Sequence, residues 1–170
     1  NEVKNFIYAS SSSVYGGNKK MPFNVEDRVN QPLALYGATK RANELIAHSY
    51  SHLYGLHTTG LRYFTVYGPW YRPDMAMFIF TQKIMAGKPI PVYNNGDMKR
   101  DFTYIDDVIS GTRSAIEKNY KCEIFNLGNS KSESLMDLIG IIETSLGKKA
   151  QIEYLPMQPG DVKESLADIK

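Results

Sequence analysis

Short apolar runs alternate along the chain with longer segments in which apolar residues recur every three or four positions. Runs of this length are typical of buried parallel strands, and the recurring spacing is typical of helices that bury one face. We expect strands at about 4–9, 58–64, 100–105, 123–127 and 151–155, with a short extended piece at about 89–93. We expect helices at about 35–54, 75–86, 106–118 and 135–146. Strands that alternate with helices predict an α/β protein.

The expected helices carry residues that favour helix ends. Gly55, Gly87 and Gly147 follow three of them, and glycine readily adopts the left-handed turn that closes a helix. Asp74 precedes the second helix and is predicted to cap it, and Ser134 is predicted to cap the last one.

The composition narrows the range of partners. The chain has 170 residues, 42% of them hydrophobic and 22% charged, which is enough for one domain with a core. A net charge of +2 gives no reason to expect a nucleic acid or an anionic membrane as partner, and no stretch reaches the ~20 continuous apolar residues of a membrane helix. The single cysteine, Cys122, excludes an internal disulfide, and the pair His48 and His52 lacks an apparent third ligand, so we predict no metal site.

Both ends of the sequence look cut. The first expected strand begins almost at residue 1, and residues 167–170 bring no closing element. No turn of the form Gly-x-Gly-x-x-Gly occurs, although such a turn lets the backbone approach the pyrophosphate of a dinucleotide. If the protein uses a dinucleotide, we expect the half that binds it to precede these residues.

A serine run that ends the first strand is followed by a tyrosine and a lysine on the first helix. Ser11 can hold and polarise a substrate hydroxyl, and Tyr36 can remove its proton. Lys40 lies one helical turn beyond Tyr36, where its charge can lower the pKa of the phenol from its ordinary value near ~10. The pattern therefore favours acid–base chemistry at a carbon that carries a hydroxyl.

The Tyr-x-x-x-Lys spacing alone is a weak signal, because the Tyr and Lys content of the chain gives roughly one such match by chance. Tyr15 and Lys19 match as well, but they bracket a Gly-Gly-Asn turn. Tyr36 and Lys40 share one helix face. The alternative for this pair is a partly buried tyrosine beside a solvated lysine, and the serine run upstream favours catalysis over it.

Together these residues resemble the extended short-chain dehydrogenase/reductases that act on nucleotide sugars, the NAD-dependent epimerase/dehydratase family. The resemblance covers nearly the whole chain. It rests on five segments in order, namely Ser11–Gly16, Tyr36-x-x-x-Lys40, Leu61–Pro69, Arg100–Val108 and Gln158–Val162.

The resemblance implies the C-terminal part of a Rossmann-like doubly wound parallel sheet together with a small α/β substrate-binding domain. Residues 1–66 are then the end of the NAD-binding domain, with the Ser, Tyr and Lys. Residues 67–170 are mainly the sugar-nucleotide-binding domain, with some elements returning to the sheet. The N-terminal cofactor half and the extreme C-terminus are missing.

Within the family the chain is most similar to UDP-glucuronate 4-epimerases. Thr65 stands where UDP-galactose epimerases usually have Asn, and the loop 68–76 is similar to the glucuronate branch. Tyr71 departs from the Gly that is usual there.

The resemblance implies an epimerisation that uses NAD. NAD takes a hydride from C4 of the sugar while Tyr36 takes the proton of the 4-hydroxyl and Ser11 hydrogen-bonds its oxygen. Lys40 holds the cofactor ribose and keeps the Tyr36 phenolate accessible. The 4-keto sugar then turns over and receives the hydride on its other face, so that no net redox change occurs.

The same resemblance assigns further binding residues. Tyr63 and Phe64 contact the nicotinamide end of NAD. Arg100 pairs with the sugar-nucleotide diphosphate, and Asp161 lies near the uridine ribose. Arg100 can alternatively form an ion pair with a neighbouring carboxylate, Asp101 or Asp97.

Two further groups of residues have open alternatives. Val92 and Tyr93 line the uracil pocket or form a buried edge strand. The candidates for the sugar carboxylate, which needs a cation or several donors, are Ser12, Ser13, Thr65 and Arg72. Arg72 can equally be a solvent-facing loop residue.

Other readings stay open. A UDP-glucose/galactose 4-epimerase, a UDP-glucuronate decarboxylase or a nucleotide-sugar 4,6-dehydratase would share the fold, but dehydratases typically carry Thr-Asp-Glu where Ser11, Ser12 and Ser13 stand. A non-catalytic nucleotide-sugar-binding fragment is the alternative of another class, and we expect residues 1–170 alone to show no epimerase activity and to bind NAD poorly. The resemblance implies a UDP-sugar as the partner, a cytoplasmic location and a possible homodimer of the full-length protein.

Overall fold

A parallel sheet of three strands, in the order β1-β2-β6, organises one end of the molecule. The structure is a computed structural model, and it describes residues 3–170. The strands are β1 (Asn5–Ser11), β2 (His57–Tyr63) and β6 (Cys122–Leu127). In the register of the sheet, Ser11 lies beside Tyr63, and Tyr63 lies beside Leu127. The carboxyl ends of the three strands therefore meet at one edge.

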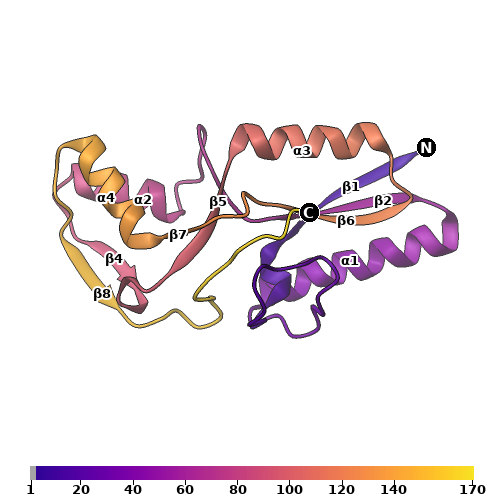
Figure 1. Ribbon diagram of the computed structural model, residues 1–170, viewed down its shortest axis with the longest axis horizontal. Coiled ribbons are helices and arrows are strands. Elements are labelled where there is room, and N and C mark those ends of the chain that lie inside the picture. Colours follow the sequence, from indigo (N-terminus) through magenta and orange to yellow (C-terminus); the bar gives the residue numbers. More distant parts are fainter. Residues whose placement is uncertain (1–2) are drawn as a thin grey trace.

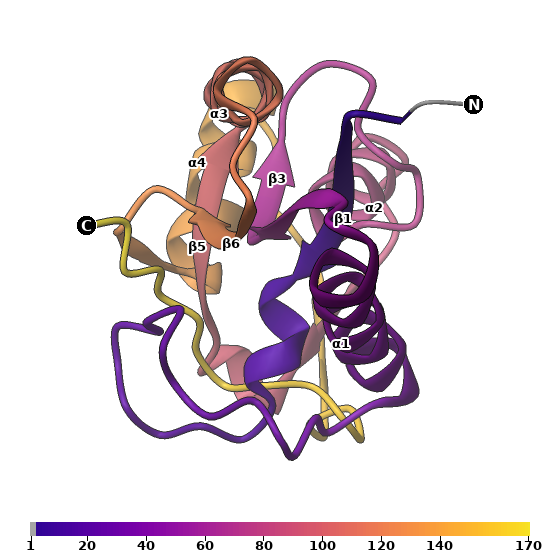
Figure 2. The same ribbon diagram turned by 90° about the vertical axis from the view of Figure 1, so that its right-hand side faces the viewer.

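Two long helices cover this sheet. They are α1 (Leu35–Tyr54) and α3 (Ile105–Lys118). In the end-on view of Figure 2, the strands lie between the two helices. The residues that α1 buries are small or polar, namely Gly37, Glu44, Ala47 and Ser51, whereas Leu45 and Ile46 are exposed. α1 ends at Gly55, whose φ of 65° is left-handed, as the sequence predicted.

The other end of the molecule is built from shorter elements (Figure 1). Its two-stranded parallel sheet pairs β4 (Ile90–Tyr93) with β8 (Ile152–Leu155). Beside it lie the helices α2 (Ala76–Met85) and α4 (Leu135–Leu146). A third sheet lies between the two ends, in the order β3-β5-β7, and its strands are β3 (Thr65–Tyr67), β5 (Lys99–Tyr104) and β7 (Ser132–Ser134). Two short 3-10 helices, η1 (Ser12–Tyr15) and η2 (Asn94–Gly96), follow β1 and β4.

Two separate clusters of buried apolar residues match the two ends. The first consists of Val14, Tyr15, Phe23, Val29, Phe64 and Ala167. The second consists of Phe80, Ile84, Ile90, Val92, Ile139 and Ile142. The division of the chain at residue 66 stays a prediction. β6 and α3 come later in the sequence, and they return to the first sheet, where β6 packs on β2 and α3 packs on β1 and β2.

The C-terminal segment 161–168 returns from β8 to the first sheet (Figure 1). Its backbone forms isolated bridges from Glu164 to Lys99 and from Ala167 to Phe23. The backbone N–H of Phe23 donates to Leu166 at 2.8 Å, and Ala167 has no exposed surface. The segment therefore ties the loop after η1 to β5.

The α/β fold that the sequence predicted is confirmed, and most elements lie within two residues of their expected bounds. The predicted cap at Asp74 is wrong, because α2 begins at Ala76 without a side-chain cap and the Asp74 carboxylate pairs with Arg72 instead. The predicted cap at Ser134 is confirmed, since its hydroxyl accepts hydrogen bonds from the first turn of α4. None of the helices within residues 3–170 combines the length and apolar character needed to cross a bilayer.

Candidate active site

A cavity of about 680 Å³ opens at the carboxyl ends of β1 and β2. The loop that follows β2 and the returning C-terminal segment complete its walls. Most of the residues predicted for the site line this cavity: Ser11, Ser12, Ser13, Tyr36, Tyr63, Phe64, Thr65, Arg72, Arg100 and Asp161. Lys40, Val92 and Tyr93 are absent from the described residues that line it.

Ser11 is held firmly at the point where β1 ends. Its hydroxyl oxygen accepts the backbone N–H of Ser13 at 3.1 Å and thereby caps η1. Its own proton is donated to the hydroxyl of Ser13 at 3.2 Å. That proton is the one that can turn towards a ligand in the cavity, since the cap uses only a lone pair of the oxygen.

Tyr36 lies in the first turn of α1 and lines the cavity, and Lys40 lies one turn further along the helix. Tyr36 is 56% exposed, and the Lys40 ammonium lies 5.7 Å from the centroid of its ring. The same ammonium donates a hydrogen bond of 2.9 Å to the carbonyl of Ala9 in β1. The charge of Lys40 is thus fixed beside the phenol by a backbone contact, within the range of cation–π attraction.

Glycine at position 37 lets this first turn approach the serines. A Cβ atom placed on Gly37 would come within 2.6 Å of the carbonyl oxygen of Ser13. The close approach of α1 to η1 therefore depends on the missing side chain, and it brings Tyr36 to the cavity that Ser11 lines.

Arg100 and Asp161, two predicted site residues far apart in the sequence, form an ion pair at 2.9 Å. Arg100 also donates to the carbonyls of Lys99 and Lys163. Burial lowers the pKa of the Arg100 guanidinium, and the Asp161 carboxylate opposes that shift. The contacts of Arg100 with Asp161 and with the two carbonyls hold its guanidinium at the wall of the cavity.

The alternative partners of Arg100 are wrong. Asp101 has no exposed surface, and its carboxylate accepts the backbone N–H groups of Asn129, Ser130 and Ala167. Asp97 pairs with Lys163.

Arg72 is exposed, and its guanidinium forms two hydrogen bonds of 3.1 Å with the Asp74 carboxylate. Arg72 also lines the cavity. Its position therefore agrees with both interpretations of this residue, the substrate-binding one and the solvent-facing one. Thr65 begins β3 and pairs with Phe102 of β5, which holds it at the cavity wall.

Val92 belongs to the second apolar cluster and has no exposed surface. Its strand β4 pairs only with β8 among the described residues. The buried-strand interpretation describes Val92, whereas Tyr93 is half-buried in the same strand, and a role of either residue in binding uracil stays a prediction.

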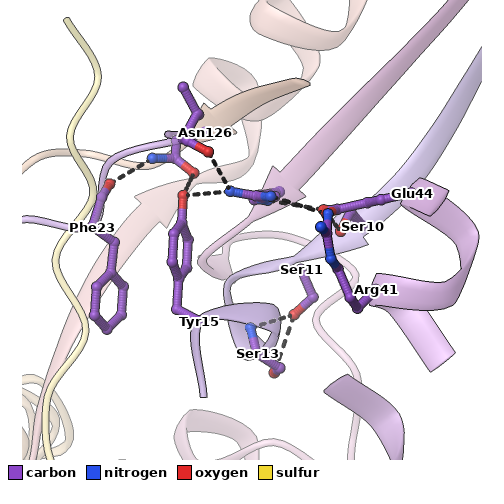
Figure 3. A network of polar contacts seen from close by, with 10 residues as sticks. Ser10, Ser11, Ser13, Tyr15, Phe23, Arg41, Glu44 and Asn126 are labelled. Carbon is purple, nitrogen blue, oxygen red and sulfur yellow. Dashed lines mark hydrogen bonds and ion pairs between the residues drawn. The ribbon is translucent and has the colours of Figure 1, made fainter. Parts of the chain in front are cut away.

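A buried ionic network, which the sequence reading missed, lies behind the cavity (Figure 3). Arg62 of β2 donates to both carboxylate oxygens of Glu44 in α1, at 2.8 and 2.9 Å. Glu44 also accepts from Ser10 at 2.6 Å and from Arg41 at 2.9 Å. Arg62 donates in turn to the hydroxyl of Tyr15 at 3.0 Å.

The charges of this network are stabilised by their partners. Burial raises the pKa of Glu44, but hydrogen bonds from Arg62 and Ser10 outweigh it and hold that pKa below its ordinary value. Burial lowers the pKa of Arg62, and the hydrogen bonds to Glu44 again outweigh it, so that this pKa is raised. Both groups therefore stay ionised in the interior.

The loop after β3, which the sequence indicated only through the family resemblance, adds residues to the cavity wall. Pro69, Trp70 and Tyr71 line the cavity, and Trp70 is fully exposed with a left-handed φ of 63°. Within residues 3–170, no group of three or more His, Cys, Asp or Glu side chains is arranged to hold a metal ion.

A parallel sheet with helices on both faces, and a Ser, Tyr and Lys at the carboxyl ends of its strands, define part of a Rossmann-like enzyme of the short-chain dehydrogenase class. The chain belongs to the NAD dependent epimerase/dehydratase family, whose model matches residues 1–128. The predicted family membership is thereby confirmed.

Individual relatives agree with this family. A protein of Methanocaldococcus jannaschii is 57% identical over 168 residues, which cover 99% of this chain and 52% of that protein. UDP-glucuronate 4-epimerase 1 of Arabidopsis thaliana is 47% identical over 180 residues, covering 96% of this chain and 42% of that enzyme. The chain spans about half the length of the curated relatives it matches.

A solved structure shares the whole fold of the chain. The crystal structure of UDP-glucuronic acid 4-epimerase from Bacillus cereus, in complex with UDP-glucuronic acid and NAD, superposes with a TM-score of 0.92 at 38% identity. The match covers 99% of this chain and 54% of that enzyme. The Rossmann-like fold predicted from the sequence is confirmed by this superposition.

Proposed function

We propose that this chain is the catalytic and sugar-nucleotide-binding half of an NAD-dependent 4-epimerase that interconverts UDP-glucuronate and UDP-galacturonate through a 4-keto intermediate. The observation that carries the proposal is the common cavity. Ser11 and Tyr36 reach it from β1 and α1, and Arg72 and Arg100 bring two cations to its wall. The relatives that are UDP-glucuronate 4-epimerases support the choice of substrate.

The residues around the cavity fit the nicotinamide and ribose of NAD. Tyr63 and Phe64 offer aromatic walls at the end of β2. The Lys40 ammonium binds the carbonyl of Ala9, a residue of the cavity lining, and we propose that it donates to ribose hydroxyls from there. Bound NAD supplies reversible hydride acceptance, which the side chains of the protein cannot provide.

The side chains divide the remaining work. Tyr36 takes the proton of the sugar 4-hydroxyl at its phenolate oxygen and later returns it. Ser11 donates its hydroxyl proton to the same sugar oxygen, and the Lys40 ammonium lies 5.7 Å from the centroid of the Tyr36 ring. The dehydratase alternative is disfavoured because serines at 11–13 supply no carboxyl acid or base for the loss of water.

We propose that Arg100 leaves Asp161 in part to hold the diphosphate, since a guanidinium fork matches phosphate oxygens. Asp161 then lies free to accept from the ribose. The sugar carboxylate is assigned to Arg72, Thr65, Ser12 and Ser13.

The other half of the enzyme is proposed to supply the strands beyond β1. Among the described residues, β1 pairs with β2 alone, which leaves its opposite edge available to a neighbouring strand. The cytoplasmic location and the homodimer stay predictions.

The test uses the complete protein that contains these residues. It is incubated with UDP-glucuronate without added NAD, and the anomeric protons of the sugar are followed by NMR. Appearance of UDP-galacturonate supports the proposal, whereas conversion of UDP-glucose alone would refute the carboxylate assignment. No conversion of either sugar would refute epimerisation.

Arg72→Ala tests the assignment of the carboxylate. Loss of a charged hydrogen bond predicts an increase of about tenfold in KM for UDP-glucuronate. Arg113→Ala is the matched control, because Arg113 lies on the exposed face of α3 in a surface ion pair with Glu117.

A further inference from the structure

Glu44 occupies the same stripe of α1 as the two residues that act in the proposed reaction. Tyr36, Lys40 and Glu44 lie four residues apart, and positions with this spacing share one helix face. Eight residues of α-helix span about 12 Å, so Glu44 lies too far along the helix to touch a sugar bound at Tyr36. Any effect of Glu44 on the reaction must therefore pass through its neighbours.

One of those neighbours is Ser10, the middle one of three consecutive residues of β1 that connect α1 to the cavity. The Lys40 ammonium holds the carbonyl of Ala9, and the Glu44 carboxylate accepts from the hydroxyl of Ser10 at 2.6 Å. The next residue, Ser11, faces the cavity. Two contacts from this face of α1 therefore fix β1 relative to the helix. They hold the two residues that immediately precede Ser11.

The same carboxylate also fixes β2. Arg62 binds both of its oxygens and is followed directly by Tyr63, which lines the cavity. Through Tyr15 the network continues to Asn126 of β6, because the Tyr15 hydroxyl donates to the Asn126 amide oxygen at 2.7 Å. A single buried network therefore crosses α1, η1 and all three strands of the sheet (Figure 3).

We propose that Glu44 and Arg62 are positioning residues, whose ion pair sets the register of α1 on β1 and β2 and so the separation of Tyr36 from Ser11. The inference rests on the proposed epimerase function. A fully satisfied network of directional hydrogen bonds specifies one arrangement of its partners, and we infer that apolar side chains of the same volume would specify the register of α1 less closely.

The first variant is Glu44→Gln in the complete protein. It keeps the shape of the side chain and leaves the Arg62 charge without a partner. A misplacement of about 1 Å lowers kcat by roughly a hundredfold, so we expect kcat to fall by about tenfold to a hundredfold with little change in KM. Glu117→Gln is the matched control, because it breaks an exposed ion pair on α3 and should leave kcat unchanged.

The second variant separates positioning from stability. The triple variant S10A/E44M/R62M replaces the buried pair by apolar side chains and removes the Ser10 hydroxyl, which would otherwise lose its partner. Such replacements often restore or raise stability. We expect a melting temperature close to that of the wild type together with a low kcat. Recovery of kcat along with the melting temperature would overturn the proposal, because the pair would then serve stability alone. If Glu44→Gln fails to fold, the triple variant still tests whether the ion pair positions the catalytic residues.

Crystal structures of the wild type and the triple variant give a readout that needs no turnover. An increased distance between the hydroxyl oxygens of Ser11 and Tyr36 supports the positioning role, and an unchanged distance overturns it. A wild-type protein that converts no sugar would refute the proposed function, and this distance would still decide the role of Glu44.

Discussion

Replacement of Gly37 by alanine should slow the reaction while it strengthens the helix. Alanine is favoured over glycine by about 1 kcal/mol in a helix interior, which is an upper limit for Gly37, the third residue of α1. Its Cβ atom, however, would lie 2.6 Å from the carbonyl oxygen of Ser13, whereas ordinary contacts begin at 3.4 Å. The first turn of α1 must then move away from η1 by about 0.8 Å, the difference between these two distances.

A shift of this size acts directly on Tyr36, the residue before the glycine. Because a displacement of about 1 Å can cost a hundredfold in rate, we expect kcat of the complete protein to fall by roughly thirtyfold to a hundredfold. That loss corresponds to about 2–3 kcal/mol in the activation free energy. The assay is steady-state conversion of UDP-glucuronate followed by NMR, with the melting temperature measured in parallel.

Gly140→Ala is the matched control. Gly140 lies inside α4, and a Cβ atom there would meet no heavy atom within 4 Å. We expect this variant to gain stability and to keep its kcat. An unchanged kcat in Gly37→Ala, at a melting temperature no lower than that of the wild type, would refute the reasoning about the approach of α1 to the serines.

Three further predictions concern single side chains. Tyr36→Phe should lower kcat by about 10²–10⁴-fold, because the hydroxyl that transfers the proton is lost. The melting temperature should stay unchanged, because Tyr36 is 56% exposed. A residual rate near that of the wild type would exclude Tyr36 as the base. Val92→Ala should lower the free energy of unfolding by about 1.5–3 kcal/mol in urea titrations, because Val92 is buried in the second apolar cluster. KM should stay unchanged. A raised KM would mean that Val92 does contact the nucleotide. Glu44 has a folded-state pKa below its ordinary value, so its contribution to stability is complete above that ordinary value and is lost as the pH falls through the lowered one. The wild type should therefore exceed Glu44→Gln in unfolding free energy by about 3–5 kcal/mol near neutral pH. Urea titrations repeated from neutral to acid pH should show this difference disappear as Glu44 is protonated. A difference that does not depend on pH would contradict the role of the ionised Glu44 carboxylate.

Local signals in the sequence were enough to predict the long elements. The helix at 35–54 was predicted with its bounds because its apolar spacing is regular and Gly55 closes it. The strands β3 and β7 were missed, because three residues are too few to show a period of two. Asp74 failed as a cap because a neighbouring arginine competes for its carboxylate.

The contacts of the site depend on residues far apart in the chain. The spacing of Tyr36 and Lys40 predicted their common face, since four residues define one helical turn. No spacing indicates that Arg100 meets Asp161, because these residues are brought together only by the return of the C-terminal segment. No role was predicted for Glu44 and Arg62 from the sequence, and only tertiary packing shows that they are buried together.

The returning segment 161–168 also sets the order in which the site can form during synthesis. Domains tend to fold from the N-terminus as the chain leaves the ribosome. Until the backbone of Ala167 arrives, the buried Asp101 carboxylate lacks one of its donors, and the wall that holds Asp161 opposite Arg100 is missing. The sheet with Ser11 and Tyr36 can assemble early, but we expect the nascent chain to acquire its nucleotide-binding wall only after residue 168 has emerged. The proposed catalytic groups would then be in place before the proposed nucleotide-sugar site is complete.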